Sequence, residues 1–278
     1  MTVSLFASTA TLVSEFLVMR VLTFFLFLGL TGFVTPIYPD ARGDELIDKY
    51  LNLSARRDAV LSMRVDYREQ QKEPIRLEFT WMRKIKRGLA WHLLRMESPL
   101  SEKGKLLLVH EKENGDAEYI AYRPNSVLKK KVRVSAARNY KYKGLSISVQ
   151  ELIGGELLKY THQFNGVEKV NGVICYVVEN KLRSQFKNDS NYPRSLIYLR
   201  QDNGMPLKWE LFGNSDTLEK IIQVEAVKKI DGLWTVARAL VEDLKKKGQL
   251  TLTLKEADPN PDLKDQWFRE DYLKKNSR

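Results

Sequence analysis

Histidine and cysteine, the residue types that most often bind metals or act as nucleophiles, are scarce in this chain. The three histidines, His92, His110 and His162, show no pair at metal-ligand spacing. The single cysteine, Cys175, lies in an apolar run without a neighbouring histidine, which favours a small buried hydrophobic residue. A Gly-x-Ser-x-Gly elbow, a phosphate-binding glycine loop and a His-Glu-x-x-His sequence are all absent. We therefore predict no catalytic residue, no cofactor and no metal site.

Apolar side chains at a spacing of two are the recurrent pattern instead. Residues 61–67 and 75–81 alternate between apolar and polar side chains, and later stretches around 209 and 252 repeat the alternation. A period of two places the apolar residues on one face of a strand. Ordinary core packing and the lining of a binding cavity both explain such a face. The candidates for cavity lining are Met63, Val65, Tyr67, Leu77, Phe79, Trp81, Trp209, Leu211, Leu252 and Leu254.

Strands in hairpin order are the elements that must position these side chains. Turn sequences such as Asp202-Asn203-Gly204 and Asp231-Gly232 separate the apolar stretches, and no βαβ spacing occurs. About eleven strands in one antiparallel sheet should curl or close, and a barrel of this size can hold a ligand. Strand-like stretches cover residues 61–67, 75–81, 91–96, 105–110, 118–123, 128–134, 158–164, 173–180, 194–200, 205–212, 221–228, 233–241 and 250–255.

Short helices are expected at three places. Residues 44–53 have apolar side chains at helical spacing and two acids in the first turn. Residues 147–153 are consistent with one or two helical turns, and residues 265–275 with a terminal helix or an extended arm.

The N-terminus has the pattern of a secretory signal. Arg20 precedes an uncharged run of 14 residues, 21–34, and Pro36, Pro39 and Gly43 follow it. The run is shorter than the roughly 20 residues of a membrane-spanning helix, although an uncleaved inner-membrane anchor remains the alternative. Met19 is an alternative start, in which case residues 1–18 are not translated. We predict a signal peptide over 1–41 and one domain over 42–278.

Charge and composition indicate a globular domain with a basic surface. The net charge is +11, but 46 Lys and Arg are interspersed with 35 Asp and Glu. This dispersion argues against a nucleic-acid partner. An ordinary soluble surface and a basic face that makes transient contact with anionic lipid headgroups explain the positive net charge equally well.

A series of motifs in fixed order resembles the periplasmic lipoprotein-sorting carrier superfamily (LolA/LolB-like), in particular its branch associated with lipid exporters of the resistance-nodulation-division type. The resemblance extends from residue 98 to residue 273, nearly the whole mature domain. It departs from the family after Gly144, where Leu145-Ser146-Ile147-Ser148 stands in place of the usual acidic residues. The motifs are SP (98–99), KGKLL (103–107), YRP (122–124), KVRVS (131–135), GLSISVQEL (144–152), VNGVICY (170–176), YPR (192–194), DGLW (231–234), GQLTLTL (248–254) and the stretch 267–273.

The resemblance implies a mainly β fold: an open, incomplete antiparallel barrel whose short helices cover an apolar cavity for acyl chains. The expected function is that of a periplasmic, non-enzymatic carrier of lipoprotein acyl chains or other lipids, moving them between membranes or to an inner-membrane exporter. Two alternatives stay open: an envelope adaptor with a filled barrel, and an enzyme acting on a lipid. A polar dyad in an otherwise apolar pocket would favour the enzyme, and the volume of the cavity separates the adaptor from the carrier.

Overall fold

The computed structural model describes residues 41–54, 56–113, 117–122, 145–153, 157–259 and 261–276. These residues belong to one compact unit that begins at Pro39. The predicted signal peptide lies outside the described residues, apart from Ala41 at its last position, and so do the strand at 128–134 and the motif at 131–135.

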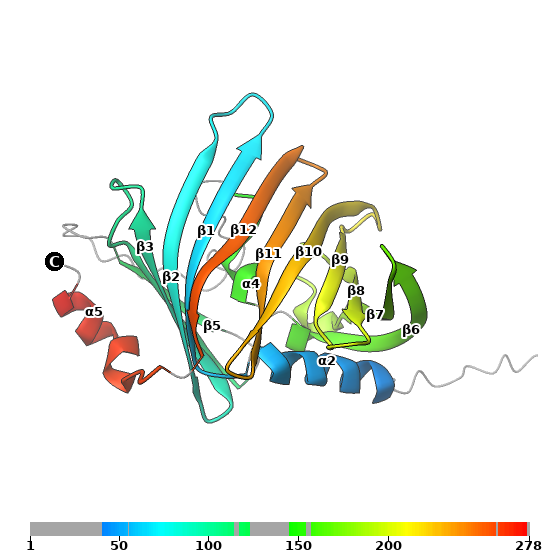
Figure 1. Ribbon diagram of the computed structural model, residues 1–278, viewed down its shortest axis with the longest axis horizontal. Helices are drawn as coiled ribbons and strands as arrows, with labels where there is room; N and C mark the ends of the chain where they lie inside the picture. Colours follow the sequence, from blue (N-terminus) through cyan, green and yellow to red (C-terminus); the bar gives the residue numbers. More distant parts are fainter. Residues whose placement is uncertain are drawn as a thin grey trace, which may run out of the picture. The chain divides into compact units, whose positions relative to one another are not determined.

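One antiparallel sheet of twelve strands forms the body of this unit (Figure 1). The strand order across the sheet is β5-β4-β3-β2-β1-β12-β11-β10-β9-β8-β7-β6. The strands are β1 (Ala59–Glu69), β2 (Ile75–Lys86), β3 (Leu89–Ser98), β4 (Leu106–Glu111), β5 (Ala117–Tyr122), β6 (Tyr160–Val170), β7 (Val173–Leu182), β8 (Arg194–Arg200), β9 (Pro206–Phe212), β10 (Leu218–Ile230), β11 (Leu233–Asp243) and β12 (Gly248–Asp258).

The first and last strands meet in the middle of the sheet, where β1 pairs with β12 and Met63 lies opposite Leu254. Every other neighbour in the sheet is a neighbour in sequence, so the chain forms two meanders joined by this one long-range pairing. β5 and β6 are the two edges of the sheet, which curves without closing. The predicted fold class, an open antiparallel barrel, is confirmed, with twelve described strands where about eleven were expected.

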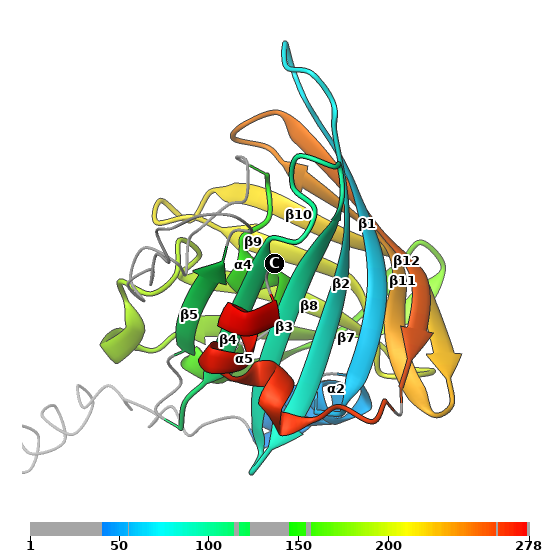
Figure 2. The ribbon, with the colours of Figure 1, turned by 90° about the vertical axis from the view of Figure 1, so that its left-hand side faces the viewer.

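Alternating burial shows which face of the sheet is covered. In β1, Leu61, Met63, Val65 and Tyr67 are buried while the residues between them are partly exposed. The buried face continues onto β2 and β12, because Met63 pairs with Phe79 and with Leu254. We call this side the inner face; it curves around the helices α2 (Ala41–Ser54) and α4 (Val149–Ile153) (Figure 2).

Helix α2 covers the β6–β9 half of the inner face. Ile47 and Leu51 of the helix pack with Leu157, Val178, Ile197 and Leu199 in one buried cluster. The helix approaches β6 so closely that a Cβ atom on Gly43 would lie 2.6 Å from the carbonyl oxygen of His162. Only glycine fits at this contact. The prediction of an opening amphipathic helix over 44–53 is therefore confirmed, with slightly wider bounds.

A C-terminal arm covers the outer face of β3, β4 and β5. It consists of η4 (Asp265–Phe268) and α5 (Glu270–Asn276). Leu263, Phe268 and Leu273 of this segment pack against Leu93, Leu108, Ile120 and Tyr122. Trp91 on β3 stacks on His110 and contacts the Phe268 ring. Two further short helices, η2 (Leu157–Lys159) and η3 (Ser184–Phe186), precede β6 and β8.

Candidate functional site

The inner face has an apolar middle, and most of the residues predicted from sequence lie there. Met63, Val65, Tyr67, Leu77, Phe79, Trp81 and Leu254 are buried members of one hydrophobic cluster, and the partly buried Leu252 packs against it. Their strands are β1, β2 and β12. The predicted common face is therefore present, and whether it lines a cavity for a ligand stays a prediction.

The remaining two candidates lie on the other half of the same face. Trp209 pairs with Ile197 and Ile222 across the sheet, and its partly buried ring packs against the α2 cluster. Leu211, two residues further along β9 and therefore on the same face, is buried. The indole Nε1 of Trp209 is buried without a hydrogen-bond acceptor among the described residues. An unsatisfied buried donor of this kind is costly, and a bound carbonyl or hydroxyl oxygen would satisfy it.

Residues 145–153, which we call the plug, fill the space over the apolar middle. Leu145 and Val149 are buried in the same cluster as the β1 and β2 residues, and Ile147 and Leu152 pack against it. The plug helix α4 begins with a capping box: the Ser148 amide donates to the Glu151 carboxylate (2.5 Å), and the Glu151 amide donates to Ser148 Oγ (3.2 Å). The sequence-based expectation of one or two helical turns here is confirmed.

A buried ion pair fastens the plug to the sheet. Lys220 of β10 has a fully buried side chain, and its Nζ donates to Glu151 Oε1 at 2.5 Å. The same Nζ lies 4.9 Å from the centre of the Tyr192 ring. A buried charge left without its partner costs several kcal/mol. The ion pair therefore adds to the apolar packing of the plug a buried contact with the β6–β10 half of the sheet that is costly to break.

Polar side chains cluster at the other end of the inner face. Trp81 Nε1 donates to His92 Nδ1 at 3.1 Å, and His92 Nε2 lies 3.5 Å from Glu111 Oε1. Beside them, Arg83 is 6% exposed and donates from Nε to the Arg57 carbonyl oxygen at 2.8 Å. Burial lowers the pKa of Arg83 to about 10, so the guanidinium stays charged at neutral pH.

The histidines have partners that do not suit nucleophilic catalysis. Burial lowers the pKa of His92, whose Nδ1 is occupied by the Trp81 donor. His162 Nδ1 donates to the Asn180 side-chain oxygen, and Asn180 in turn donates to Ser195, so an amide separates the imidazole from the hydroxyl. Among the described residues, no group of His, Cys, Asp and Glu side chains has the geometry to hold a metal ion. Cys175 is buried, and burial raises the pKa of its thiol.

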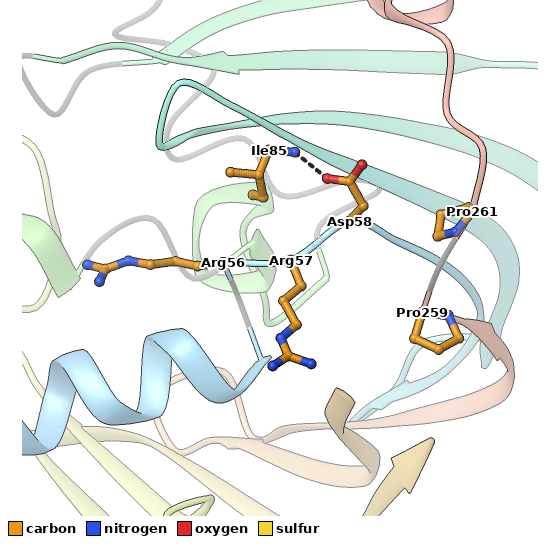
Figure 3. Close-up of a pocket in the computed structure, with 6 residues that line it drawn as sticks. All are labelled: Arg56, Arg57, Asp58, Ile85, Pro259 and Pro261. Carbon is orange, nitrogen blue, oxygen red and sulfur yellow. Dashed lines mark hydrogen bonds between the residues drawn. The ribbon is translucent and has the colours of Figure 1, made fainter. Parts of the chain in front are cut away.

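An open cavity of about 510 Å³ lies where α2 joins β1 (Figure 3). It is lined by Arg56, Arg57, Asp58, Ile85, Pro259 and Pro261. Asp58 accepts a hydrogen bond from the Ile85 amide at 2.7 Å, and Arg56 pairs with Asp48 at 3.0 Å. With its guanidinium groups and few apolar walls, this cavity suits a polar or anionic group rather than an acyl chain.

Two of the polar residues on the inner face, Arg83 and Lys220, were missed at the sequence level. The signal was present, because Arg83 continues the alternation of Phe79 and Trp81, and Lys220 that of Ile222. A charge in register with apolar residues indicates a buried pair, but the sequence does not identify the partner. The two arginines of the cavity carried no comparable signal.

Within the part of the chain that the structure describes, no helix combines the length and the apolar character needed to cross a membrane.

Three solved structures have similar folds. A DUF1329 family protein from Desulfovibrio piger aligns with a TM-score of 0.76 at 20% identity, covering 84% of this chain and 99% of that one. A domain from Vibrio parahaemolyticus, named for outer membrane lipoprotein sorting, gives 0.73 at 20% identity and covers 84% and 98%. A LolA superfamily protein from Nitrosomonas europaea gives 0.66 at 18% identity and covers 83% and 98%. At these identities the likeness establishes the fold.

Sequence comparison gives the family. A search of curated proteins found no match. A family model described as "Uncharacterized protein" matches residues 88–275, which is more than half of the chain. The match runs from β3 through the plug to the C-terminal arm. The chain belongs to this family, and its fold is that of the LolA-like lipoprotein-sorting proteins.

Proposed function

We propose that the protein is a non-enzymatic carrier that holds the acyl chains of a lipid or lipoprotein on the apolar middle of its inner face. The observation that carries this proposal is the plug. Its four apolar side chains occupy the face that strands β1, β2 and β12 build, and it is a short helix fastened by one ion pair. A short element of this kind can open locally at low cost.

Replacement of the apolar side chains of the plug by an apolar acyl chain supports the proposal energetically. Each CH₂ group of an acyl chain costs about 0.8 kcal/mol to hold in water, so a lipid crosses an aqueous compartment only when it is sheltered. When the plug swings out, the acyl chain takes the place of Leu145, Ile147, Val149 and Leu152. The cargo then moves to whichever site binds it more tightly, because a carrier sets no direction by itself.

The polar groups at the two sides of the apolar middle suit an amphiphile. The unsatisfied Trp209 Nε1 offers a hydrogen bond to an ester or amide carbonyl. The arginines at the α2–β1 junction offer positive charge to a headgroup. The site thus matches a molecule with an apolar chain and a polar head. The compartment that we propose is the periplasm, and an inner-membrane exporter of the resistance-nodulation-division type is the proposed partner.

A carboxylate placed on the inner face tests the proposal. Leu252→Glu and Trp209→Glu should each leave the thermal melt near that of wild type and abolish binding of a fluorescent fatty-acyl probe, because both positions are only partly buried and a carboxylate there can stay hydrated. Gln249→Glu, exposed on the outer face of the same strand, is the matched control and should bind the probe normally.

Collapse of the melt in both variants would instead favour a filled barrel, since burying an unpaired carboxylate in a packed core costs several kcal/mol. Unchanged probe binding in folded variants would show that the acyl chain does not occupy this face.

A further inference from the structure

Five turns lie together at one end of the sheet. Because every neighbouring pair of strands is antiparallel, five turns lie at the end of the sheet where β1 ends and β12 begins: β1–β2, β3–β4, β7–β8, β9–β10 and β11–β12. Figure 1 shows two of them, β1–β2 and β11–β12, at its upper side. We call this end of the sheet the hairpin end. The plug lies beneath it, since a Cβ atom on Gly248 would meet Ser146 Oγ at 2.9 Å.

The β11–β12 turn presents a leucine and three lysines to solvent. Leu244 is 45% exposed, and Lys245, Lys246 and Lys247 follow it, all exposed. The turn is held in place from below: the Leu244 amide donates to the Glu219 carbonyl oxygen at 2.9 Å, and the Lys246 amide donates to the buried Asp243 carboxylate at 2.9 Å. The acid of this turn therefore points inward, and the apolar and cationic side chains point outward.

The β3–β4 turn repeats this arrangement. Leu100 is 86% exposed, the highest value among the exposed large hydrophobic residues that the structure describes. Lys103 is exposed beside it, whereas the acid of the turn, Glu102, is buried and paired with Lys105. Across all five turns the exposed cations exceed the exposed acids: Lys72, Lys103, Arg183, Lys187, Lys245, Lys246 and Lys247 against Glu73 and Asp216.

We propose that the hairpin end docks on an anionic lipid bilayer surface, with Leu244 and Leu100 entering the headgroup region and the lysines pairing with lipid phosphates. Apolar side chains surrounded by lysines are the combination that binds interfaces, by burial of apolar area and by attraction to anionic lipid. Another exposed apolar pair, Val167 and Ile174, lies at the opposite end, where Glu168 and Lys169 balance each other. The excess of exposed cations therefore favours the hairpin end over the opposite end as the contact with an anionic surface.

Docking in this orientation brings the plug to the membrane. The ion pair between Lys220 and Glu151 and the contact between Gly248 and Ser146 both lie at this end of the inner face. A carrier docked here would open toward the bilayer. The docking does not depend on the proposed function, because the hairpin end can bind a membrane whether or not the inner face carries cargo.

Vesicle binding of the protein isolated from the envelope fraction tests the docking. We expect co-flotation with phosphatidylglycerol-containing vesicles that weakens as salt is raised, and little co-flotation with pure phosphatidylcholine. A lysine near an anionic surface contributes about fivefold in partitioning, so Lys246→Gln/Lys247→Gln should weaken binding about 25-fold. Leu244→Ser should weaken it about tenfold through the lost apolar contact.

The matched control is Lys169→Gln/Lys228→Gln, which removes the same charge from exposed positions away from the hairpin end. It should bind vesicles like wild type. Equal losses in the control and in Lys246→Gln/Lys247→Gln would overturn the proposal, because attraction would then follow net charge alone. Binding to envelope protein but not to lipid vesicles would also overturn it, in favour of a protein partner.

A fluorophore at the turn gives a second readout that does not depend on affinity. Leu244→Cys labelled with an environment-sensitive dye should shift to the blue on anionic vesicles, whereas the same label on Ile174→Cys should not; the buried Cys175 should stay unlabelled. Absence of a shift at position 244 with vesicles bound would contradict the orientation. Acyl-probe binding measured on the same samples separates this result from failure of the proposed cargo site.

Discussion

At the residue scale, burial sets the protonation of the histidines. His92 and His162 are buried and His110 is partly buried, and burial, the largest cause in every case, lowers the pKa of each imidazole below its ordinary value of 6.5. The unfolded chain therefore binds protons at a higher pH than the folded chain. It follows that the contribution of these residues to stability is complete above about pH 6.5 and is lost as the pH falls toward the folded-state pKa values.

This linkage predicts that the free energy of unfolding decreases between pH 7 and pH 5, by about 1.4 kcal/mol for each full unit by which a histidine pKa is depressed. His92→Gln should flatten the decrease, because His92 is the most deeply buried of the three. Urea unfolding across this range measures the slope. An unchanged slope in His92→Gln would mean that His92 does not carry the effect.

At the scale of elements, the proposed uptake of an acyl chain depends on the stability of the plug. Glu151→Gln should keep the capping box, since glutamine also accepts the Ser148 amide, but it removes the charge that Lys220 needs. The buried ammonium then favours the open plug. Hydrogen exchange of amides 148–153 and uptake of an acyl probe should both become faster, while the sheet amides stay protected.

The compensating variant is Glu151→Gln/Lys220→Met, which removes both charges and should restore slow exchange at the plug, because a well-packed apolar residue often replaces a buried charge without loss. If Glu151→Gln instead accelerates exchange evenly over the whole sheet, the plug is part of the permanent core and does not open separately.

The elements themselves follow from local sequence, but their pairing does not. Alternation identified the strand residues, helical spacing identified α2, and residues 147–153 were consistent with the one or two helical turns that α4 forms. By contrast, Lys220 and Glu151 are 69 positions apart, and only the folded sheet brings them together. The same is true of the cavity, whose arginines follow α2 while its prolines follow β12. Contacts of this kind depend on register over the whole sheet, which sequence pattern alone does not supply.

At the scale of the whole molecule, a periplasmic carrier must be exported. The basic residue Arg20 and the apolar run 21–34 predict that the N-terminus is removed before about Asp44, ahead of the domain that carries the sheet. N-terminal sequencing of the protein from the envelope fraction should therefore begin near residue 42. A cytosolic species that retains Met1 or Met19 would rule out a periplasmic carrier.

Both faces of the sheet carry covering segments. The inner face is shielded by α2 and the plug, and the outer face of β3–β5 by the C-terminal arm. Among the covering segments that the structure describes, the plug combines a short helix with a buried ion pair, whereas in the arm Asp265 pairs with Lys84 and Lys86 and the Phe268 ring is buried. The cargo is therefore expected on the inner face.

Mass spectrometry of the organic extract of protein purified from the periplasm shows whether the inner face carries lipid. We expect an acyl-containing lipid in a near-stoichiometric amount, which Leu252→Glu loses and the outer-face control Gln249→Glu retains. An extract free of acyl-containing molecules from well-folded wild-type protein, or equal amounts of lipid in both variants, would contradict the claim that the inner face carries lipid.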